Sequence, residues 1–148
     1  MNPADVPSGP VLVDTDVASW LLTDPAKAQP WAALLRGHLL ALSFVNVGEL
    51  LAFAHVKRWG DARREEWATG IRSTFVVLPQ SGRMAETWAP LHVKYSGHMQ
   101  KGGANDLWIA AAALTAQPRL PLATGNVSDF SKVAVDHPLQ LIHPDLPS

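Results

Sequence analysis

The chain has 148 residues, of which 47% are hydrophobic and 17% are charged, and it contains no cysteine. This length and composition suit one folded domain and exclude an intrinsically disordered protein. The absence of cysteine excludes disulfides, thiolate metal sites and cysteine nucleophiles. A formal net charge of −1 gives no general attraction to nucleic acid or to an anionic membrane, so a polyanionic substrate needs a local patch, a metal ion or a basic partner.

The start of the chain is rich in proline and lacks the basic and apolar regions of a signal peptide. The longest apolar stretch, residues 107–114, is far shorter than the roughly 20 residues that span a bilayer. We therefore expect a cytoplasmic protein that does not associate with membranes. We divide it into a flexible N-terminal segment (1–10), one domain (11–143) and a C-terminal tail (144–148).

Five short apolar runs are typical of buried strands in a parallel sheet, because their apolar residues are continuous rather than alternating. These runs are residues 11–13, 39–42, 75–78, 120–123 and 139–142. Segments with helical spacing of apolar residues separate them. This alternation predicts a single three-layer α/β/α domain with a mostly parallel sheet of about five strands.

Polar residues mark the predicted helix starts, since their side chains accept hydrogen bonds from free N–H groups of the first turn. In chain order these residues are Asp16 or Ser19, Asn46, Asp61, Ser81, and Asn105 or Asp106. Asn46, with Glu49 three residues later, fits a capping box. Helix 107–117 is apolar almost all round, which places it inside the protein. We expect Pro90 to kink or divide the fifth helix and residues 124–130 to form a turn with about one helical turn.

Three carboxylates occupy similar places in this scheme. Asp14 follows the first strand, Glu49 lies near the start of the helix after the second, and Asp106 begins the buried helix. Because the carboxyl ends of parallel strands meet at one edge of a sheet, we expect these side chains to gather there. Gathered carboxylates repel one another unless a cation lies among them, and such oxygen ligands suit Mg²⁺ or Mn²⁺. Each acid taken alone is more simply explained as a helix cap.

Four segments resemble the motifs of the PIN domain. They are residues 11–16 (VLVDTD), 43–50 (SFVNVGEL), 104–111 (ANDLWIAA) and 122–130 (LATGNVSDF). Their order and spacing resemble most closely the VapC-type toxins of bacterial toxin–antitoxin pairs, over nearly the whole chain. The resemblance implies a Mg²⁺-dependent endoribonuclease that hydrolyses RNA phosphodiester bonds with a metal-activated water. It also implies a cognate antitoxin protein as partner and a homodimer.

By this resemblance Asp14 and Asp106 are metal ligands. Glu49 is a further ligand through water, or a base that orients the attacking water. The family usually has a fourth acidic or polar position in its last motif, and here Asn126 is followed by Asp129, so either residue is a candidate to complete the site. The predicted catalytic residues are Asp14, Glu49, Asp106 and Asp129.

Four further residues are candidates for supporting roles. Thr124 and Ser43 are predicted to donate hydrogen bonds behind the carboxylates. Asn126 is predicted to accept from a metal-bound water, and Lys101, near Asp106 in sequence, to contact substrate. The two hydroxyl groups are equally well explained as donors in helix caps or turns.

Two other functions compete with the nuclease. A haloacid-dehalogenase-like phosphohydrolase would use Asp14 and Asp16 as nucleophile and acid/base, with Ser43 as its phosphate-binding hydroxyl. Its late acidic pair is absent here, Lys132 is poorly placed for it, and Glu49 would have no role. A non-catalytic protein-interaction module would use the acids only as helix caps. Incubation with RNA, with and without Mg²⁺, discriminates between these functions.

Overall fold

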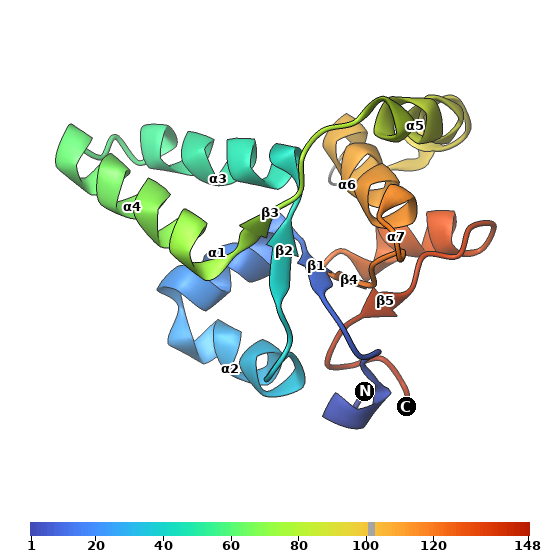
Figure 1. Cartoon of the computed structure of the whole chain (residues 1–148), viewed down its shortest axis with the longest axis horizontal. Coiled ribbons are helices and arrows are strands. Elements are labelled where there is room, and N and C mark those ends of the chain that lie inside the picture. The colour runs from blue at the N-terminus through green and yellow to red at the C-terminus, as the bar shows by residue number, and fades with distance from the viewer. Residues whose placement is uncertain (101–102) are drawn as a thin grey trace.

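A computed structural model describes residues 1–100 and 103–148 of the chain (Figure 1). Within these residues five short strands form one sheet in the order β3-β2-β1-β4-β5, and all neighbouring strands are parallel. The strands are β1 (Val11–Val13), β2 (Leu40–Leu42), β3 (Val76–Val77), β4 (Leu122–Ala123) and β5 (Leu141–Ile142). The helices are α1 (Thr15–Thr23), α2 (Pro25–Leu34), α3 (Phe44–Val56), α4 (Asp61–Thr74), α5 (Gly82–Tyr95), α6 (Gly103–Thr115) and α7 (Val127–Ala134). The predicted α/β fold with a parallel sheet is confirmed.

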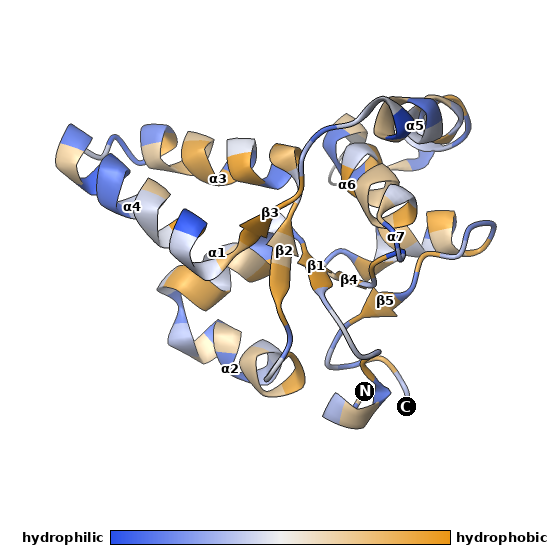
Figure 2. Ribbon diagram, in the orientation of Figure 1, coloured by the Kyte–Doolittle hydropathy of each residue, from blue (hydrophilic) through white to orange (hydrophobic). Residues whose placement is uncertain are grey.

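The two faces of the sheet bury separate sets of apolar residues. Successive side chains of a strand point to opposite faces, so Val11 and Val13 pack with α1 to α4, whereas Leu12 packs with α5 to α7. The strands are hydrophobic along their length (Figure 2), as is typical of a parallel sheet covered on both faces, although Val76 and Val77 of the edge strand β3 are exposed. Helix α6 is buried almost all round, as its sequence predicts. The result is the predicted three-layer arrangement.

The topological switch point of the sheet lies between β1 and β4, two neighbouring strands that the chain leaves toward opposite layers. The chain leaves β1 toward α1, in one layer, and leaves β4 toward α7, in the other. Ligands of open parallel sheets bind outside the carboxyl ends of the strands, at such a switch point. Asp14 directly follows β1, and its backbone N–H donates to the Ala123 carbonyl of β4 at 2.8 Å. The sheet therefore brings Asp14 next to Thr124.

Helix α1 begins immediately after Asp14, which is its N-cap. The Oδ1 atom of Asp14 accepts a hydrogen bond from the backbone N–H of Thr15 at 2.8 Å. The predicted caps Asp16 and Ser19 are wrong, since both lie inside the helix. Asp14 is thus a strand end and a helix cap at once, with its second oxygen left for other partners.

Helix α3 begins three residues earlier than predicted. Ser43 is the N-cap, with its hydroxyl oxygen 3.2 Å from the backbone N–H of Asn46, and the Ser43 N–H donates to Asn46 Oδ1 at 3.0 Å. The reciprocal box is therefore formed by Ser43 and Asn46, and Glu49 lies in the second turn rather than the first. Similarly, Gly60 and not Asp61 is the N-cap of α4.

The remaining helices are longer or less interrupted than expected. Ser81 caps α5 as predicted, and the helix continues through Pro90 without division. Helix α6 starts at Gly103, so Asp106 lies in its first turn rather than at its cap. Residues 127–134 form a full helix, α7, where the sequence predicts a turn with little helix.

The two ends of the chain lie together (Figure 1). Residues 1–10, predicted to be flexible, contain a 3₁₀ helix (Pro3–Asp5) and bury Val6. The N-terminal amino group donates to the carbonyl of Pro144 at 3.1 Å, so the first segment contacts the predicted tail. Among the residues described, no helix has the length and apolar character needed to cross a membrane. The domain limits at residues 11 and 143 stay predictions.

Candidate active site

Asp14 is buried, with 6% of its surface exposed, at the edge of the sheet where β1 and β4 end. The Thr124 hydroxyl donates to Asp14 Oδ2 at 2.7 Å. The same hydroxyl oxygen accepts the backbone N–H of Asn126 at 2.9 Å, so its own proton is directed at the carboxylate. Thr124 therefore lies behind Asp14, with its hydroxyl proton pointing to the carboxylate, and fixes the direction of that carboxylate.

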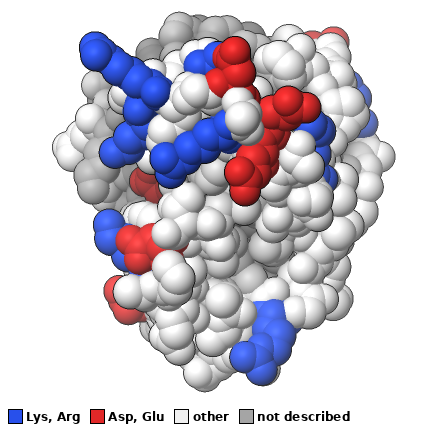
Figure 3. Space-filling model, turned by 90° about the vertical axis from the view of Figure 1, so that its left-hand side faces the viewer, with Lys and Arg blue, Asp and Glu red and all other residues white. Residues whose placement is uncertain are grey.

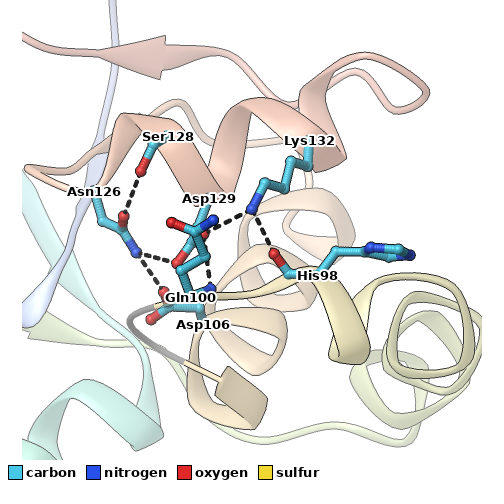
Figure 4. A network of polar contacts seen from close by, with 7 residues as sticks. All are labelled: His98, Gln100, Asp106, Asn126, Ser128, Asp129 and Lys132. Carbon is cyan, nitrogen blue, oxygen red and sulfur yellow. Dashed lines mark hydrogen bonds and ion pairs between the residues drawn. The ribbon is translucent and has the colours of Figure 1, made fainter.

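Asp106 and Asp129 meet at Asn126, which comes from the turn after β4 (Figure 4). The Asn126 Nδ2 atom donates to Asp106 Oδ2 at 2.9 Å and to Asp129 Oδ2 at 3.0 Å. Ser128 Oγ donates to Asn126 Oδ1 at 3.3 Å and supports this orientation of the amide. Asp106, Asn126 and Asp129 are all buried. Since the backbone of Asn126 also donates to the hydroxyl behind Asp14, one residue connects both parts of the site.

Glu49 is held by side chains from α1, α3 and α6. Thr15 Oγ1 donates to Glu49 Oε1 at 2.7 Å, and Asn105 Nδ2 lies 3.4 Å from Oε2. Asn46 Nδ2 donates to Thr15 Oγ1 at 3.0 Å, and the Ser43 hydroxyl donates to Asn46 Oδ1 at 2.7 Å. Ser43 therefore acts through two other residues rather than on a carboxylate directly. The sequence patterns did not predict the supporting roles of Thr15, Asn46 and Asn105, because a capping pattern explains Asn46 and the motifs that contain the other two assign them no role.

Burial and mutual repulsion perturb the two central carboxyl groups. Desolvation raises the pKa of Asp14 to about 6, against the opposing effect of the hydrogen bond from Thr124. Desolvation also raises the pKa of Asp106 to about 7, and the negative charge of Asp14 is the next largest cause. Glu49 raises the pKa of both groups, and Asp129 raises that of Asp106. Asp16 also raises the pKa of Asp14, so five acids interact electrostatically at this edge.

The chemistry of this donor set fits a hard divalent cation. Asp14 and Asp106 offer buried carboxylate oxygens, and desolvation together with neighbouring acids raises the pKa of both groups. Within residues 1–100 and 103–148, no three Asp, Glu or His side chains form a ready-made cation site. Mg²⁺ commonly uses one or two carboxylates and keeps several waters. Two carboxylates are therefore a sufficient set.

Lys132 brings a positive charge to the site, a role that no sequence motif predicts. Lys132 Nζ lies 3.1 Å from Asp129 Oδ1, one turn along α7. Lys101, the predicted substrate contact, lies outside the described residues.

A sequence model of the PIN domain family matches residues 11–135 of the chain. The chain belongs to the PIN-domain family. The resemblance predicted from the four motifs is confirmed, and PIN domains are nucleases. Membership of this family argues against the haloacid-dehalogenase-like alternative.

Solved structures share the fold of this PIN domain. VapBC-1 from nontypeable Haemophilus influenzae is 22% identical, with 93% of this chain and 99% of that chain covered and a TM-score of 0.71. VapBC2 from Rickettsia felis, in a structure with a DNA fragment from the VapBC2 promoter, is 19% identical, with 90% of this chain and 97% of that chain covered and a TM-score of 0.69. VapBC-5 from Mycobacterium tuberculosis, a member of a family of toxin–antitoxin systems, is 24% identical, with 93% and 99% covered and a TM-score of 0.63. No curated protein matches the chain.

Proposed function

We propose that this PIN domain is a Mg²⁺-dependent endoribonuclease, able to use Mn²⁺, and the toxin component of a toxin–antitoxin pair. One observation carries the nuclease proposal: Asp14 and Asp106 are both buried at the edge of the sheet and are connected through Thr124 and Asn126. Membership of a nuclease family supports it further. The fold shared with VapBC toxin–antitoxin structures supports the toxin role.

Each residue of the site has a separate task in this proposal. Asp14 and Asp106 would hold the ion, which when bound polarises the phosphodiester and makes water a better nucleophile. Thr124 and Asn126 hold the two carboxylates in fixed directions by donating to them. Glu49, itself fixed through Thr15, orients the attacking water and accepts its proton.

The proposed substrate is RNA, and the proposed partners are a cognate antitoxin and a second copy of the chain, in the cytoplasm. Acidic and basic side chains are intermixed on the face of the molecule where α3 and α4 lie (Figure 3). Arg64 and Asp61 of α4 form an ion pair. That face offers no broad basic surface for a polyanion. RNA binding by the ion and by local contacts, including predicted contact with Lys101, agrees with the net charge of −1.

RNA cleavage by the purified protein, in Mg²⁺ and in EDTA, tests the enzymatic proposal. Asp14→Asn and Asp106→Asn should each lower cleavage by at least about 100-fold, the scale of losing a group that stabilises transition-state charge, and both should keep the wild-type circular dichroism spectrum. The matched control is Asp16→Asn, which removes the same charge from an exposed position in the first turn of α1 and should cleave normally.

Other outcomes would support the competing functions. Loss of activity in Asp16→Asn would favour the phosphohydrolase, and wild-type protein that binds RNA or a partner but never cuts would favour the interaction module. Growth arrest on expression in bacteria, absent for Asp14→Asn, tests the toxin role. Mapping RNA ends in the same cells identifies the RNA that is cut.

A further inference from the structure

Asp129 is completely buried on α7, and its carboxylate has partners from three parts of the chain (Figure 4). Oδ1 accepts the backbone N–H of Gln100 at 3.0 Å and faces Lys132 Nζ at 3.1 Å. Oδ2 accepts Nδ2 of Asn126 at 3.0 Å. Lys132 also donates to the carbonyl of His98, so the ion pair fastens residues 98–100 to α7.

This ion pair differs from an ordinary surface pair. A buried carboxylate is strongly unfavourable unless it is paired and hydrogen-bonded. Lys132 supplies the compensating charge, and only 33% of its side chain is exposed. A second lysine–aspartate pair, Lys94 with Asp136 just after α7, is 58% and 42% exposed. The two pairs have the same chemistry in different surroundings, which makes the second a natural control.

The buried pair is connected to Asp106 through a single amide group. The Asn126 NH₂ group has two hydrogens, and its two acceptors are Asp106 Oδ2 and Asp129 Oδ2. With both hydrogens used, the amide plane is fixed, and a flipped amide would place its oxygen against two carboxylates. An aspartate at position 126 would add another negative charge there and could not donate to both acids. The orientation of Asp106 therefore depends on where Asp129 is held.

We propose that Asp129 and Lys132 are positioning residues for Asp106, acting through Asn126, and that Asp129 is not a metal ligand. This role replaces the predicted role of Asp129 as the acid that completes the site. It rests on the proposed function, in which Asp106 binds the ion. Asn126 is then the polar residue that the last motif supplies as the fourth member of the site, and it contributes by hydrogen bonding rather than by charge.

Mn²⁺ binding measured by isothermal titration calorimetry tests this role. A purely electrostatic effect of Lys132 and a positioning effect predict opposite changes in the Kd when the lysine is removed. Removal of a positive charge by Lys132→Met would tighten Mn²⁺ binding if only charge mattered. The positioning role predicts that Kd rises about tenfold, the scale seen when partners of metal ligands are removed. Lys132→Arg, which keeps the charge and the donors, should stay within about twofold of wild type. Lys94→Met loses the same charge from the exposed pair and should bind Mn²⁺ as wild type does.

Two further measurements separate positioning from loss of stability. RNA cleavage by Lys132→Met should recover at saturating Mn²⁺, which a general loss of folding would not allow. Asn126→Ala changes no charge and should weaken Mn²⁺ binding about tenfold as well. If Lys132→Met does not fold, Lys132→Gln decides in its place, since it keeps a donor for the His98 carbonyl without the charge.

The outcomes distinguish the two proposals. Wild-type protein that binds no Mn²⁺ and cuts no RNA would overturn the proposed function. Wild-type protein that does both, with an unchanged or lower Kd in Lys132→Met or Lys132→Gln, would overturn the positioning role alone.

Discussion

The acidic site has two halves that are held in different ways. Around Asp14 and Glu49 the hydrogen-bond donors are neutral hydroxyl, amide and backbone groups. Around Asp106 and Asp129 the network also contains a cation, Lys132, which is brought in by α7. The first half follows from the local geometry of strand ends and helix starts, whereas the second needs a charge to compensate a buried acid. Substitutions in the two halves should therefore have different consequences.

Among the residues that support the carboxylates, the largest effect is expected at Thr124, whose side chain supports both halves. Thr124→Val keeps the shape of the residue but removes the donor to Asp14 and the acceptor for the Asn126 N–H. We expect RNA cleavage to fall about 10–100-fold and the free energy of unfolding to fall by about 1–3 kcal/mol, because buried polar groups lose their partners. Thr124→Ser keeps both hydrogen bonds and should resemble wild type. A fully active Thr124→Val would show that this hydroxyl does not orient Asp14.

A smaller and more selective effect is expected in the first half alone. Thr15→Val removes the donor that holds Glu49, and Thr15 is only half-buried. We expect the cleavage rate to fall about tenfold through a misplaced general base, with Mn²⁺ affinity unchanged. Calorimetry and single-turnover kinetics on the same preparation separate the two quantities. A parallel loss of Mn²⁺ affinity would mean that Glu49 is itself a ligand.

The pH dependence of stability reports on both halves together. In the metal-free protein the pKa of Asp14 is about 6 and that of Asp106 about 7, raised from 3.8. The folded state therefore binds more protons than the unfolded state, so the stability from these groups is full below about pH 4 and is lost as the pH rises through about 6 to 7. Thermal unfolding in EDTA should show this decline, and the Asp14→Asn, Asp106→Asn double variant should show a flatter one.

Added Mg²⁺ should reverse this loss only where the carboxyl groups are deprotonated. We expect it to raise the melting temperature at about pH 8 and to leave it unchanged at about pH 5, since metal ligands must lose their protons. An equal rise at both pH values would place the ion elsewhere.

The strands and the positions of Asp14, Glu49 and Asp106 were predictable because they depend on patterns within a few residues. Each apolar run is long enough to show as a buried strand, and a parallel sheet then decides which ends meet. The start of α3 was harder, since Ser43 and Asn46 are both good caps and only the end of β2 decides between them.

The partners of Asp129 were not predictable from the sequence. Gln100 is 29 residues away and donates through its backbone, which leaves no side-chain signature. Lys132 is one turn away, but its role depends on the complete burial of Asp129 in a helix longer than the predicted turn. Sequence patterns thus located the acids but not the groups that fix their directions.

The smallest effect is expected at the turn that separates the supporting residues. A side chain at Gly125 would place its Cβ 3.1 Å from Cη2 of Trp20, which is only partly buried and can shift slightly. We expect Gly125→Ala to lower the free energy of unfolding by about 1 kcal/mol, the low end of the cost of overpacking. Denaturant unfolding measures it, and adding Trp20→Phe should relieve the contact. No recovery in the double variant would mean that the backbone of the turn, not the contact, sets the cost.

Anomalous scattering from crystals soaked in Mn²⁺ tests most directly whether Asp14 and Asp106 share a cation. We predict one Mn²⁺ ion within about 2.0–2.6 Å of an oxygen from each carboxylate, the range of oxygen–cation bonds, and no direct bond to Asp129. The ion should be missing in crystals of Asp14→Asn. Wild-type crystals of active protein with no Mn²⁺ between these two residues, or with Mn²⁺ bound only elsewhere, would contradict this account.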